Sequence, residues 1–441
     1  MIATTQLTSA LTQSTMTQLL NAASKMATHV ALCTVVLLMA ACSGNPGQAD
    51  EHQNAIATTR SSIDNLPIYK LPRFTGDFNI YREQSRTFLQ RHSMRQRSAE
   101  DISLNLPFEM SASSAVPYRG RFLLLHGLND SPYVWTDIAL ELVNRGFDVR
   151  APLFEGHGST PQAMLQVSYK DWLQTARDHL SSWQDPDIPL FIGGFSMGAV
   201  IATLLAIEND TGGEPDSNSG VANRPSGVAG LFLISPAFHS RLNHYLRWSG
   251  LYKKFKPWIF GGMILEDNPI KYNSIPVNSG WQFYKATREL KRKLRGETLK
   301  IPVVMVNSAN DSVVDTDIVR ALFRKHFNSS RRSLLTYHED PLPQQTATEQ
   351  YRLSSVVGTR ILNQSHLGIM YRAENPLFGK DGKILVCNGN EYPIFMACLR
   401  ASNHWLGAQH TESPDGTPVA RITYNTDFKN MLTLVDRVLL Q

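Results

Sequence analysis

Nothing in the composition of this 441-residue sequence favours a nucleic-acid-binding, repeat or membrane-spanning protein. Its 43 Lys and Arg nearly balance its 38 Asp and Glu, and the net charge of +5 gives no case for a nucleic acid partner. Internal repeats are missing, and the apolar run at residues 30–42 is too short to span a bilayer comfortably. Cysteine is scarce, with four residues: Cys33, Cys42, Cys387 and Cys398. The remaining composition, 42% hydrophobic and 18% charged, is ordinary for a globular chain with a sizeable core.

The first 42 residues have the pattern of a targeting signal. A polar stretch precedes the short apolar run, which ends in small residues and predicts a secretory signal rather than a membrane helix. Met39-Ala40-Ala41-Cys42 resembles a bacterial lipoprotein box. That resemblance implies cleavage before Cys42 and attachment of lipid to its thiol. A plain cleaved signal peptide or an uncleaved anchor is the alternative, and Met16 or Met26 is an alternative start.

The same resemblance places the protein in the cell envelope. Ser43 follows the cysteine where an aspartate would indicate retention in the inner membrane, so we expect a lipid-anchored protein of a Gram-negative outer membrane, facing the periplasm. After cleavage and lipidation, Cys387 and Cys398 are the two cysteines left free. An oxidising periplasm lets them pair in a disulfide, and two separate buried thiols are the alternative.

We expect three parts in the chain: a signal peptide at residues 1–41, a flexible polar tether at 42–66 and one domain at 67–441. Within the domain, strand-like and helix-like segments alternate, and the strands are continuously apolar. This pattern predicts an α/β fold with a mainly parallel sheet covered by helices on both faces. The expected strands are residues 101–110, 120–126, 147–152, 190–193, 231–235, 301–307 and 334–337. A polar insertion at 208–225 predicts a surface loop.

The strongest local signal is the pentapeptide Gly-Phe-Ser-Met-Gly at residues 194–198. An apolar strand-like segment precedes it and a helix-like segment, 199–207, follows it. A serine at the tip of a strand–turn–helix needs small residues two places before and two places after it, because the turn is tight. The helix that follows offers N–H groups and the positive end of its dipole to a developing oxyanion. We therefore predict that Ser196 is a nucleophile rather than part of a turn that only packs.

Serine requires a histidine to accept its proton and a carboxylate to orient that histidine. Asp311 comes just after an apolar strand, where a loop presents it at the carboxyl edge of the sheet. His366 has a serine before it and a glycine soon after, which suits a tight loop. Asp315 is the alternative acid, although it also suits a helix N-cap, and His338 is the alternative base.

The backbone supplies the remaining catalytic groups. The loop after the strand that ends in His126 has the sequence His-Gly-Leu-Asn-Asp at 126–130. We expect the N–H of Leu128 to join that of Met197 in an oxyanion hole, which needs two donors aimed at one developing charge. His126 itself is expected to be structural.

Taken together, six motifs identify a resemblance to the α/β-hydrolases, most closely to the branch that holds bacterial carboxylesterases, monoacylglycerol lipases, lysophospholipases and serine aminopeptidases. In chain order they are Leu-Leu-His-Gly-Leu at 124–128, Gly-His-Gly at 156–158, Asp-Trp at 171–172, Gly-Phe-Ser-Met-Gly at 194–198, Ser-Ala-Asn-Asp at 308–311 and Ser-His-Leu-Gly at 365–368. The resemblance covers roughly residues 100–440. It implies an α/β-hydrolase fold with a helical cap at about 238–298.

The resemblance also implies a serine hydrolase that cleaves carboxylic esters of a small molecule or lipid through an acyl-enzyme on Ser196, with Asp311 and His366 completing the triad. The triad chemistry itself calls for no metal and no organic cofactor. Peptidase, thioesterase and acyltransferase chemistry uses the same triad and stays open. So does a non-catalytic envelope lipoprotein that keeps the fold as a binding module. The oligomeric state is left open by the sequence.

One segment of the expected cap is unusual in composition. Residues 242–260 interleave aromatic and aliphatic side chains with Arg and Lys, and a second basic cluster follows at 291–295. Apolar residues at helical spacing beside cations are typical of a helix that lies on an anionic membrane surface. The same stripe also fits a cap that packs on its own core with its charges solvated. Periodicity does not separate the two.

Overall fold

The computed structural model describes residues 68–93, 97–209, 227–258, 268–272, 275–387 and 392–440. All of them belong to one unit that runs from residue 67 to residue 441. The predicted signal peptide, Cys42, the tether and most of the insertion at 208–225 lie outside the described residues, as does the 259–267 part of the cap. None of the helices within the described ranges is long and apolar enough to cross a membrane.

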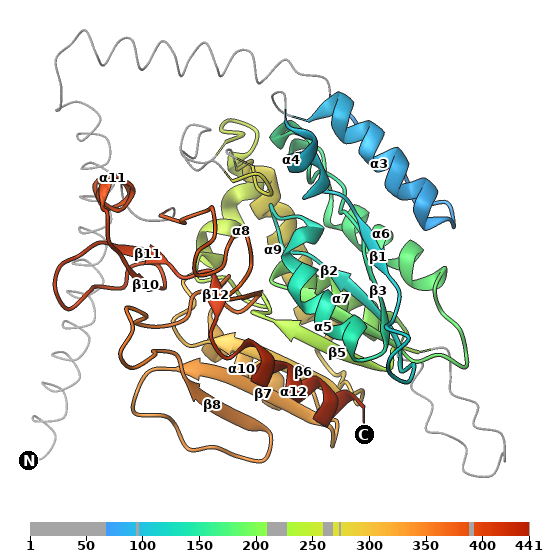
Figure 1. The fold of residues 1–441 in the computed structure, drawn as a ribbon. Helices are drawn as coiled ribbons and strands as arrows, with labels where there is room; N and C mark the ends of the chain where they lie inside the picture. The colour runs from blue at the N-terminus through green and yellow to red at the C-terminus, as the bar shows by residue number, and fades with distance from the viewer. Residues whose placement is uncertain are drawn as a thin grey trace, which may run out of the picture. The chain divides into compact units, whose positions relative to one another are not determined.

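Eight strands form the central sheet, in the order β1-β3-β2-β4-β5-β6-β7-β8 (Figure 1). Every neighbouring pair is parallel except β1 and β3 at one edge. The strands are β1 (Phe108–Met110), β2 (Gly120–Leu125), β3 (Phe147–Ala151), β4 (Leu190–Phe195), β5 (Gly230–Ile234), β6 (Val303–Ser308), β7 (Arg332–His338) and β8 (Glu349–Leu353). The mainly parallel sheet predicted from the continuous apolar runs is confirmed.

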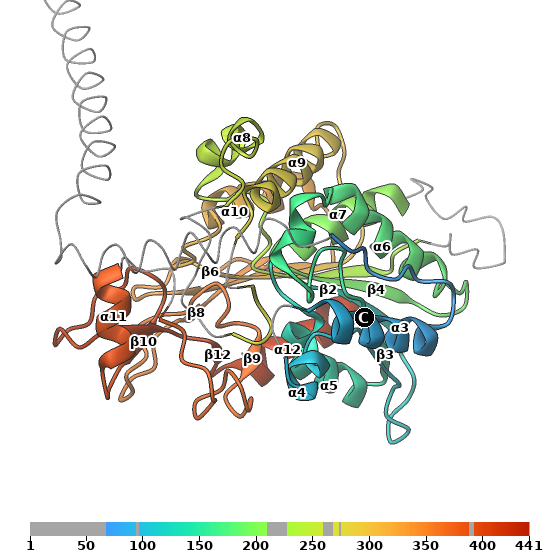
Figure 2. The same ribbon diagram turned by 90° about the horizontal axis from the view of Figure 1, so that it is seen from above.

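Helices cover both faces of this sheet because alternate strand residues point to opposite sides. Leu123 and Leu125 of β2 join one core with α6, α7, α9 and α10, whereas Phe122 and Leu124 join a second core with α5 and α12. Figure 2 shows the two layers on either side of the sheet. The layer helices are α5 (Thr136–Asn144), α6 (Tyr169–Ser181), α7 (Met197–Asn209), α9 (Val277–Lys293), α10 (Thr316–His326) and α12 (Phe428–Leu439). Short 3-10 turns, η1 (Pro132–Trp135) and η2 (Pro161–Leu165), complete the connections.

The segment before the sheet differs from the expectation. A strand was predicted over residues 101–110, but the structure has the helix α4 (Ala99–Ser103) and a short strand, β1. The reason is a capping box: the Ser98 hydroxyl accepts from the N–H of Asp101, whose carboxylate accepts from the N–H of Ser98. Preceding it is α3 (Phe78–His92), which Asp77 caps.

Two helices in the described part of the cap lie together beside the sheet. They are α8 (Asn243–Tyr252) and α9, and both project beyond α7 in Figure 2. Of the apolar residues at 242–260, Trp258 is buried and Leu246 packs against the core, but most of the others are exposed. Phe260 lies outside the described residues.

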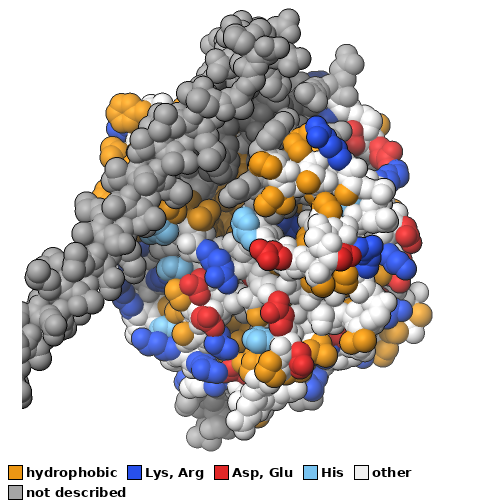
Figure 3. All heavy atoms as spheres, turned by 90° about the vertical axis from the view of Figure 1, so that its left-hand side faces the viewer, with side chains coloured by type: hydrophobic (Ala, Val, Ile, Leu, Met, Phe, Trp, Pro, Cys, Tyr) orange, Lys and Arg blue, Asp and Glu red, His pale blue; other side chains and the backbone are white. Residues whose placement is uncertain are grey.

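A long excursion separates the last sheet strand from α12. It contains β9 (Tyr371–Arg372), α11 (Tyr392–Arg400), β10 (Trp405–Gly407), β11 (Val419–Arg421) and β12 (Tyr424–Asn425). These short strands pair as two small parallel sheets, β10 with β11 and β9 with β12. The side of the molecule that this excursion occupies in Figure 1 faces the viewer in Figure 3, where acidic and basic side chains are interspersed and apolar ones gather in the upper part.

Cys387 and Cys398 are joined in a disulfide, with a sulfur–sulfur distance of 2.02 Å. Both side chains are buried beside Phe395 and Ala420, in a small core of the excursion's own. The disulfide thus ties the chain before α11 to the carboxyl-terminal turn of that helix.

Replacing both cysteines by serine should destabilise the excursion. The two cysteines are 11 residues apart, and opening a closed loop of that size typically costs about 2–4 kcal/mol. Thermal unfolding followed by circular dichroism should show a lower Tm for the double variant, and reductant should lower the Tm of the parent to the same value. A parent Tm that is unchanged by reductant would contradict this.

Candidate active site

Ser196 lies at the tip of a sharp turn between β4 and α7. Its φ of 55° is in the left-handed region, which a residue with a Cβ atom adopts at a cost of about 1–3 kcal/mol. The turn is held by the Ser196 N–H, which donates to the carbonyl of Ile234 at 3.0 Å, and by the Ser196 carbonyl, which accepts from Ala237. The strained serine is therefore fixed from the neighbouring strand, β5.

The two glycines of the pentapeptide have no room for a side chain. A Cβ atom on Gly198 would lie 2.1 Å from the carbonyl oxygen of Leu125, and one on Gly194 would lie 2.4 Å from the Cα of Ala199. These contacts are with backbone, which cannot move aside as a flexible side chain does. The small residues predicted around the serine are required because strand β2 and helix α7 approach the turn so closely.

The structure brings the three predicted triad residues together. The Nε2 of His366 lies 2.9 Å from the Oγ of Ser196, and its Nδ1 lies 2.6 Å from Oδ2 of Asp311. The Asp311 side chain is fully buried, that of His366 is 11% exposed, and Ser196 is 9% exposed. The arrangement sets the imidazole as proton donor to the carboxylate and as acceptor for the serine hydroxyl.

Asp311 occupies the loop that follows β6. Its second carboxylate oxygen accepts from the N–H groups of Val313 and Val314, both at 2.8 Å. The Arg241 guanidinium donates to its backbone carbonyl at 2.7 Å. Both oxygens of the carboxylate are thus engaged, and its orientation toward His366 is set by the backbone of its own loop.

The alternative residues lie elsewhere. Asp315 is the N-cap of α10, where its carboxylate accepts from the N–H of Ile318. His338 ends β7, with its Nδ1 2.7 Å from the carbonyl oxygen of Glu339 and its ring against Tyr351. Among the described residues, Ser196 is not a partner of either side chain.

The loop that carries His366 is fixed by serine hydroxyls. Ser235 donates to the carbonyl of His366 itself, at 3.0 Å. Ser308 donates to the carbonyl of Gln364 and Ser365 to that of Ile422, both at 2.6 Å. Since Ile422 belongs to the excursion, the cysteine-bearing segment supports the loop of the proposed base.

The predicted oxyanion loop lies beside the serine. A Cβ atom on Gly127 would be 3.4 Å from the Cβ of Ser196, which places the Gly127–Leu128 backbone next to the reactive hydroxyl. Met197 is the first residue of α7, where helix geometry leaves the N–H without a partner in the helix. Gly127 thus lies beside Ser196 and Met197 follows it in the chain, while the oxyanion hole of Leu128 and Met197 stays a prediction.

Two buried histidines hold this loop. The Nε2 of His126 accepts from the N–H of Phe154 at 3.1 Å, and the Nε2 of His157 accepts from that of Asn129 at 3.0 Å. Burial lowers the pKa of both imidazoles, that of His157 to about 4. Both rings are therefore neutral near pH 7, as their accepting role demands. This gives the Gly-His-Gly motif at 156–158 a structural role that sequence reasoning left unassigned.

Asp130 is a buried carboxyl on the same loop, and sequence reasoning gave it no role of its own. Burial raises its pKa, while the charge of Lys271 and a hydrogen bond from the N–H of Ser131 act in the opposite direction. The charge of His366 also acts to lower the pKa of Asp130. A signal for it was present in the sequence, because an acid within the expected oxyanion loop must lie near the site.

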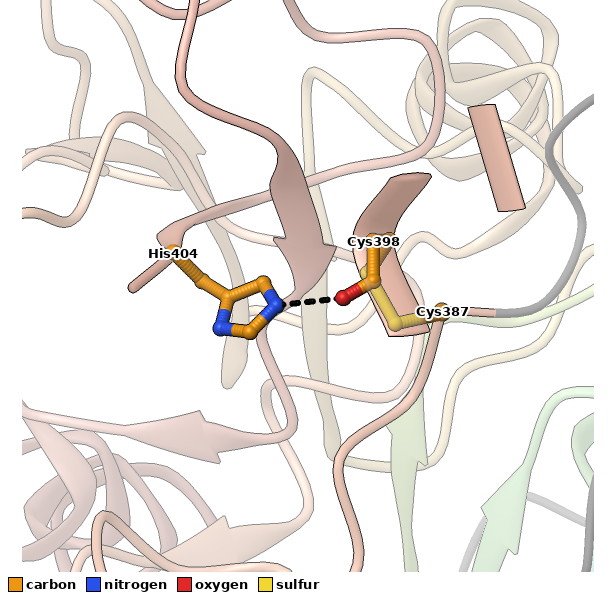
Figure 4. The surroundings of a disulfide bond; sticks show 3 residues. All are labelled: Cys387, Cys398 and His404. Carbon is orange, nitrogen blue, oxygen red and sulfur yellow. Dashed lines mark hydrogen bonds between the residues drawn. A yellow bond between two sulfur atoms is a disulfide. The ribbon is translucent and has the colours of Figure 1, made fainter. Parts of the chain in front are cut away.

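Within the described ranges, one group of cysteine and histidine side chains is close enough to share a metal ion: Cys387, Cys398 and His404. Its two sulfurs form the disulfide, and the His404 Nε2 lies 2.7 Å from the carbonyl oxygen of Cys398 (Figure 4). Metal binding needs thiolates, so this group does not present a ligand set in the oxidised protein.

The model of the serine aminopeptidase S33 family matches residues 117–339. A thermostable monoacylglycerol lipase from Bacillus sp. (strain H-257) is 26% identical over 84 residues, which are 19% of this chain and 34% of that relative. Among solved structures is a soluble variant of monoglyceride lipase from Saccharomyces cerevisiae in complex with a substrate analog. It is 17% identical, with a TM-score of 0.41, and the match covers 53% of this chain and 81% of that chain. A monoacylglycerol lipase from Paleococcus ferrophilus is 17% identical with a TM-score of 0.40, at 53% and 88% coverage.

The neutral, buried His157 predicts loss of stability in acid. Its pKa is depressed in the folded state, so between its ordinary value of 6.5 and about 4 the unfolded state binds more protons, and the free energy of unfolding falls as pH falls. The contribution is on the order of 3 kcal/mol across that window. We expect His157→Asn to be less stable at neutral pH but to lose less stability between pH 6.5 and pH 4.

The difference between variant and parent in urea unfolding at each pH measures this contribution, since other groups titrate in the same range. His244→Gln, at an exposed position on α8, is the matched control and should keep the parent's pH dependence. Identical pH dependence in the parent and in His157→Asn would show that His157 does not supply it.

Proposed function

The chain belongs to the serine aminopeptidase S33 family of α/β-hydrolases, because the family model matches just over half of it, and from this premise we propose that it cleaves carboxylic esters through an acyl-enzyme on Ser196. One observation carries the proposal: an unbroken chain of hydrogen bonds from a buried carboxylate through an imidazole to a strained serine hydroxyl. A binding module would have no need to retain this chain.

In the proposed reaction, Ser196 Oγ attacks the ester carbonyl and its proton passes to His366 Nε2. Asp311 holds the imidazole in the tautomer that accepts this proton and stabilises the imidazolium. The N–H groups of Leu128 and Met197 bind the oxyanion, and removing one such donor typically raises the barrier by about 2.7–4 kcal/mol.

The tetrahedral intermediate then collapses. The bond to the leaving alcohol breaks, and the alcohol oxygen takes the proton from His366. Water next attacks the acyl-enzyme and gives its proton to the same imidazole, and release of the acid restores the Ser196 hydroxyl. The steps balance with water as the sole co-reactant.

The name of the Bacillus relative, a monoacylglycerol lipase, supports an ester as the substrate class, whereas the family description favours a peptide. We propose the ester as the first candidate and the peptide as the second. The same triad serves both, and the leaving group decides between them.

The triad assignment predicts a sharp contrast between paired variants. Ser196→Ala should abolish turnover of p-nitrophenyl butyrate, and Asp311→Asn should lower kcat by about 10⁴-fold because the imidazole takes the wrong tautomer. Asp315→Asn and His338→Gln are the matched controls, since neither residue contacts Ser196. Both should retain kcat within a few-fold.

Full activity in Asp311→Asn, or loss of activity in a well-folded His338→Gln, would overturn the assignment. Peptide p-nitroanilides are assayed in parallel with the esters. Turnover of anilides above that of esters would replace the esterase proposal with the peptidase.

We further propose that Cys42 is lipidated and that the domain is anchored to the outer membrane, facing the periplasm. The lipoprotein box at residues 39–42 and the polar stretch at 43–66 support this. The anchor would hold the hydrolase domain at a membrane surface.

This anchor predicts covalent lipid on one residue. Cells that express the chain and are fed alkyne-palmitate should yield a labelled protein in the outer-membrane fraction. The Cys42→Ser variant should carry no label and should no longer appear in that fraction. Label retained in Cys42→Ser would contradict the proposal, and Cys33→Ser is the matched control that should keep it.

A further inference from the structure

The outer face of α8 carries a row of large apolar side chains. They follow one another at spacings of three or four residues, which places them on one face of the helix and its last turn. We call this row the α8 stripe: Leu242, Tyr245, Trp248, Tyr252 and Phe255, of which each is more than half exposed and Phe255 is 81% exposed. Leu251, also more than half exposed, lies beside it. Single exposed apolar residues are ordinary, but six within residues 242–255 are not.

The opposite face of α8 is packed. A Cβ atom on Gly250 would lie 2.7 Å from the ring of Trp281 on α9, so the two helices are in close contact there. The Lys253 ammonium donates to the side-chain oxygen of Asn278 at 2.9 Å, and Leu246 packs against the core. The helix is thus held by α9, and the stripe faces outward because the other side is occupied.

Cations accompany the stripe, both along its own segment and on the neighbouring helix α9. Residues 242–256 contain Arg247, Lys253, Lys254 and Lys256 and no acid. On α9, burial lowers the pKa of Lys285, and the nearby charges of Lys253 and Lys170 lower it further. The end of α9 adds Lys291, Arg292 and Lys293, and the acid on that helix, Glu289, is paired with Arg292. The described surface of α8 and α9 is strongly positive although the chain as a whole carries only +5.

We propose that the α8 stripe docks on the surface of an anionic phospholipid bilayer, with its aromatic side chains among the head groups and the surrounding cations on the lipid phosphates. Tyrosine and tryptophan suit that depth because each has an apolar body and a polar tip. A second copy of the chain fits this surface poorly, because it would bring two positively charged surfaces together. The docking is independent of hydrolysis and is a second membrane contact besides any lipid on Cys42.

Docking at α8 would also place the membrane close to the triad. The residue before the helix's first turn, Arg241, donates from its backbone N–H to the carbonyl of Val313 and from its side chain to that of Asp311. Arg241, which directly precedes the first residue of the α8 stripe, is therefore hydrogen-bonded to the loop of the proposed catalytic acid.

A fluorophore beside the α8 stripe tests this directly. The full chain with Leu251→Cys is labelled with bimane and reconstituted with vesicles of phosphatidylcholine, or of phosphatidylcholine and phosphatidylglycerol in equal amounts, each containing a lipid with a spin label near the head group. We expect quenching and a blue shift with the anionic vesicles and much less of both with the neutral ones. Bimane at Thr433→Cys, exposed on α12 beyond the other face of the sheet, should show neither.

Matched variants separate the two contributions. Replacing Lys253, Lys254 and Lys256 by Gln should lower the anionic partition coefficient by about a hundredfold, since each basic residue near such a surface contributes roughly fivefold. The double variant Trp248→Ser, Phe255→Ser should abolish the blue shift. Tyr118→Ser, which removes an exposed aromatic side chain distant from the α8 stripe in sequence, should not. The parent chain without an introduced cysteine sets the labelling background.

Equal quenching at positions 251 and 433 would overturn the proposal. So would quenching at position 251 that is the same with and without phosphatidylglycerol in the vesicles. A blue shift that rises with protein concentration in the absence of vesicles would overturn it in favour of a second copy. None of these readings depends on enzymatic turnover.

Discussion

A backbone turn without space for side chains is the constraint on which the rest of the site depends. Ser196 takes a φ of 55° because β4 must end and α7 must begin within one residue, against the carbonyl of Leu125 on the next strand. At this turn the Ser196 hydroxyl lies 2.9 Å from the Nε2 of His366, and Gly127 lies beside the serine. Hydrogen bonds from β5 hold the turn, so the sheet itself maintains the strain.

The other parts of the site are attached to this turn from distant segments. Asp311 is oriented by its own loop. His366 is held by the hydroxyls of Ser235, just after β5, and Ser308, at the end of β6, and by the excursion. The oxyanion loop is held by His126 and His157, whose neutral rings accept from backbone N–H groups. Polar groups that never touch a substrate thus determine where the proposed reacting atoms lie.

Much of this was accessible from the sequence, and the reasons for the exceptions are physical. The strand–turn–helix around Ser196 is local, so five residues and their flanks were enough to predict it. The prediction of a single strand over residues 101–110 was wrong, because the capping box at Ser98 begins a helix there despite the apolar residues that follow. The hydrogen bond from Ser365, beside His366, to Ile422 could not be predicted from the sequence. The two residues are 57 apart, and the strands near Ile422 are too short to give a periodic pattern. The direction of the α8 stripe was undecided because periodicity places apolar residues on one face without saying what that face contacts.

The assignment of Ser196 as the nucleophile of a formed triad is tested most directly by the intact mass of the full chain after treatment with a fluorophosphonate, followed by mapping of the modified peptide. We expect one adduct per chain, on Ser196. Ser196→Ala should abolish this adduct, and His366→Gln should greatly slow its formation. A folded chain that gains no adduct, or gains it on another serine, would show that Ser196 is not the nucleophile.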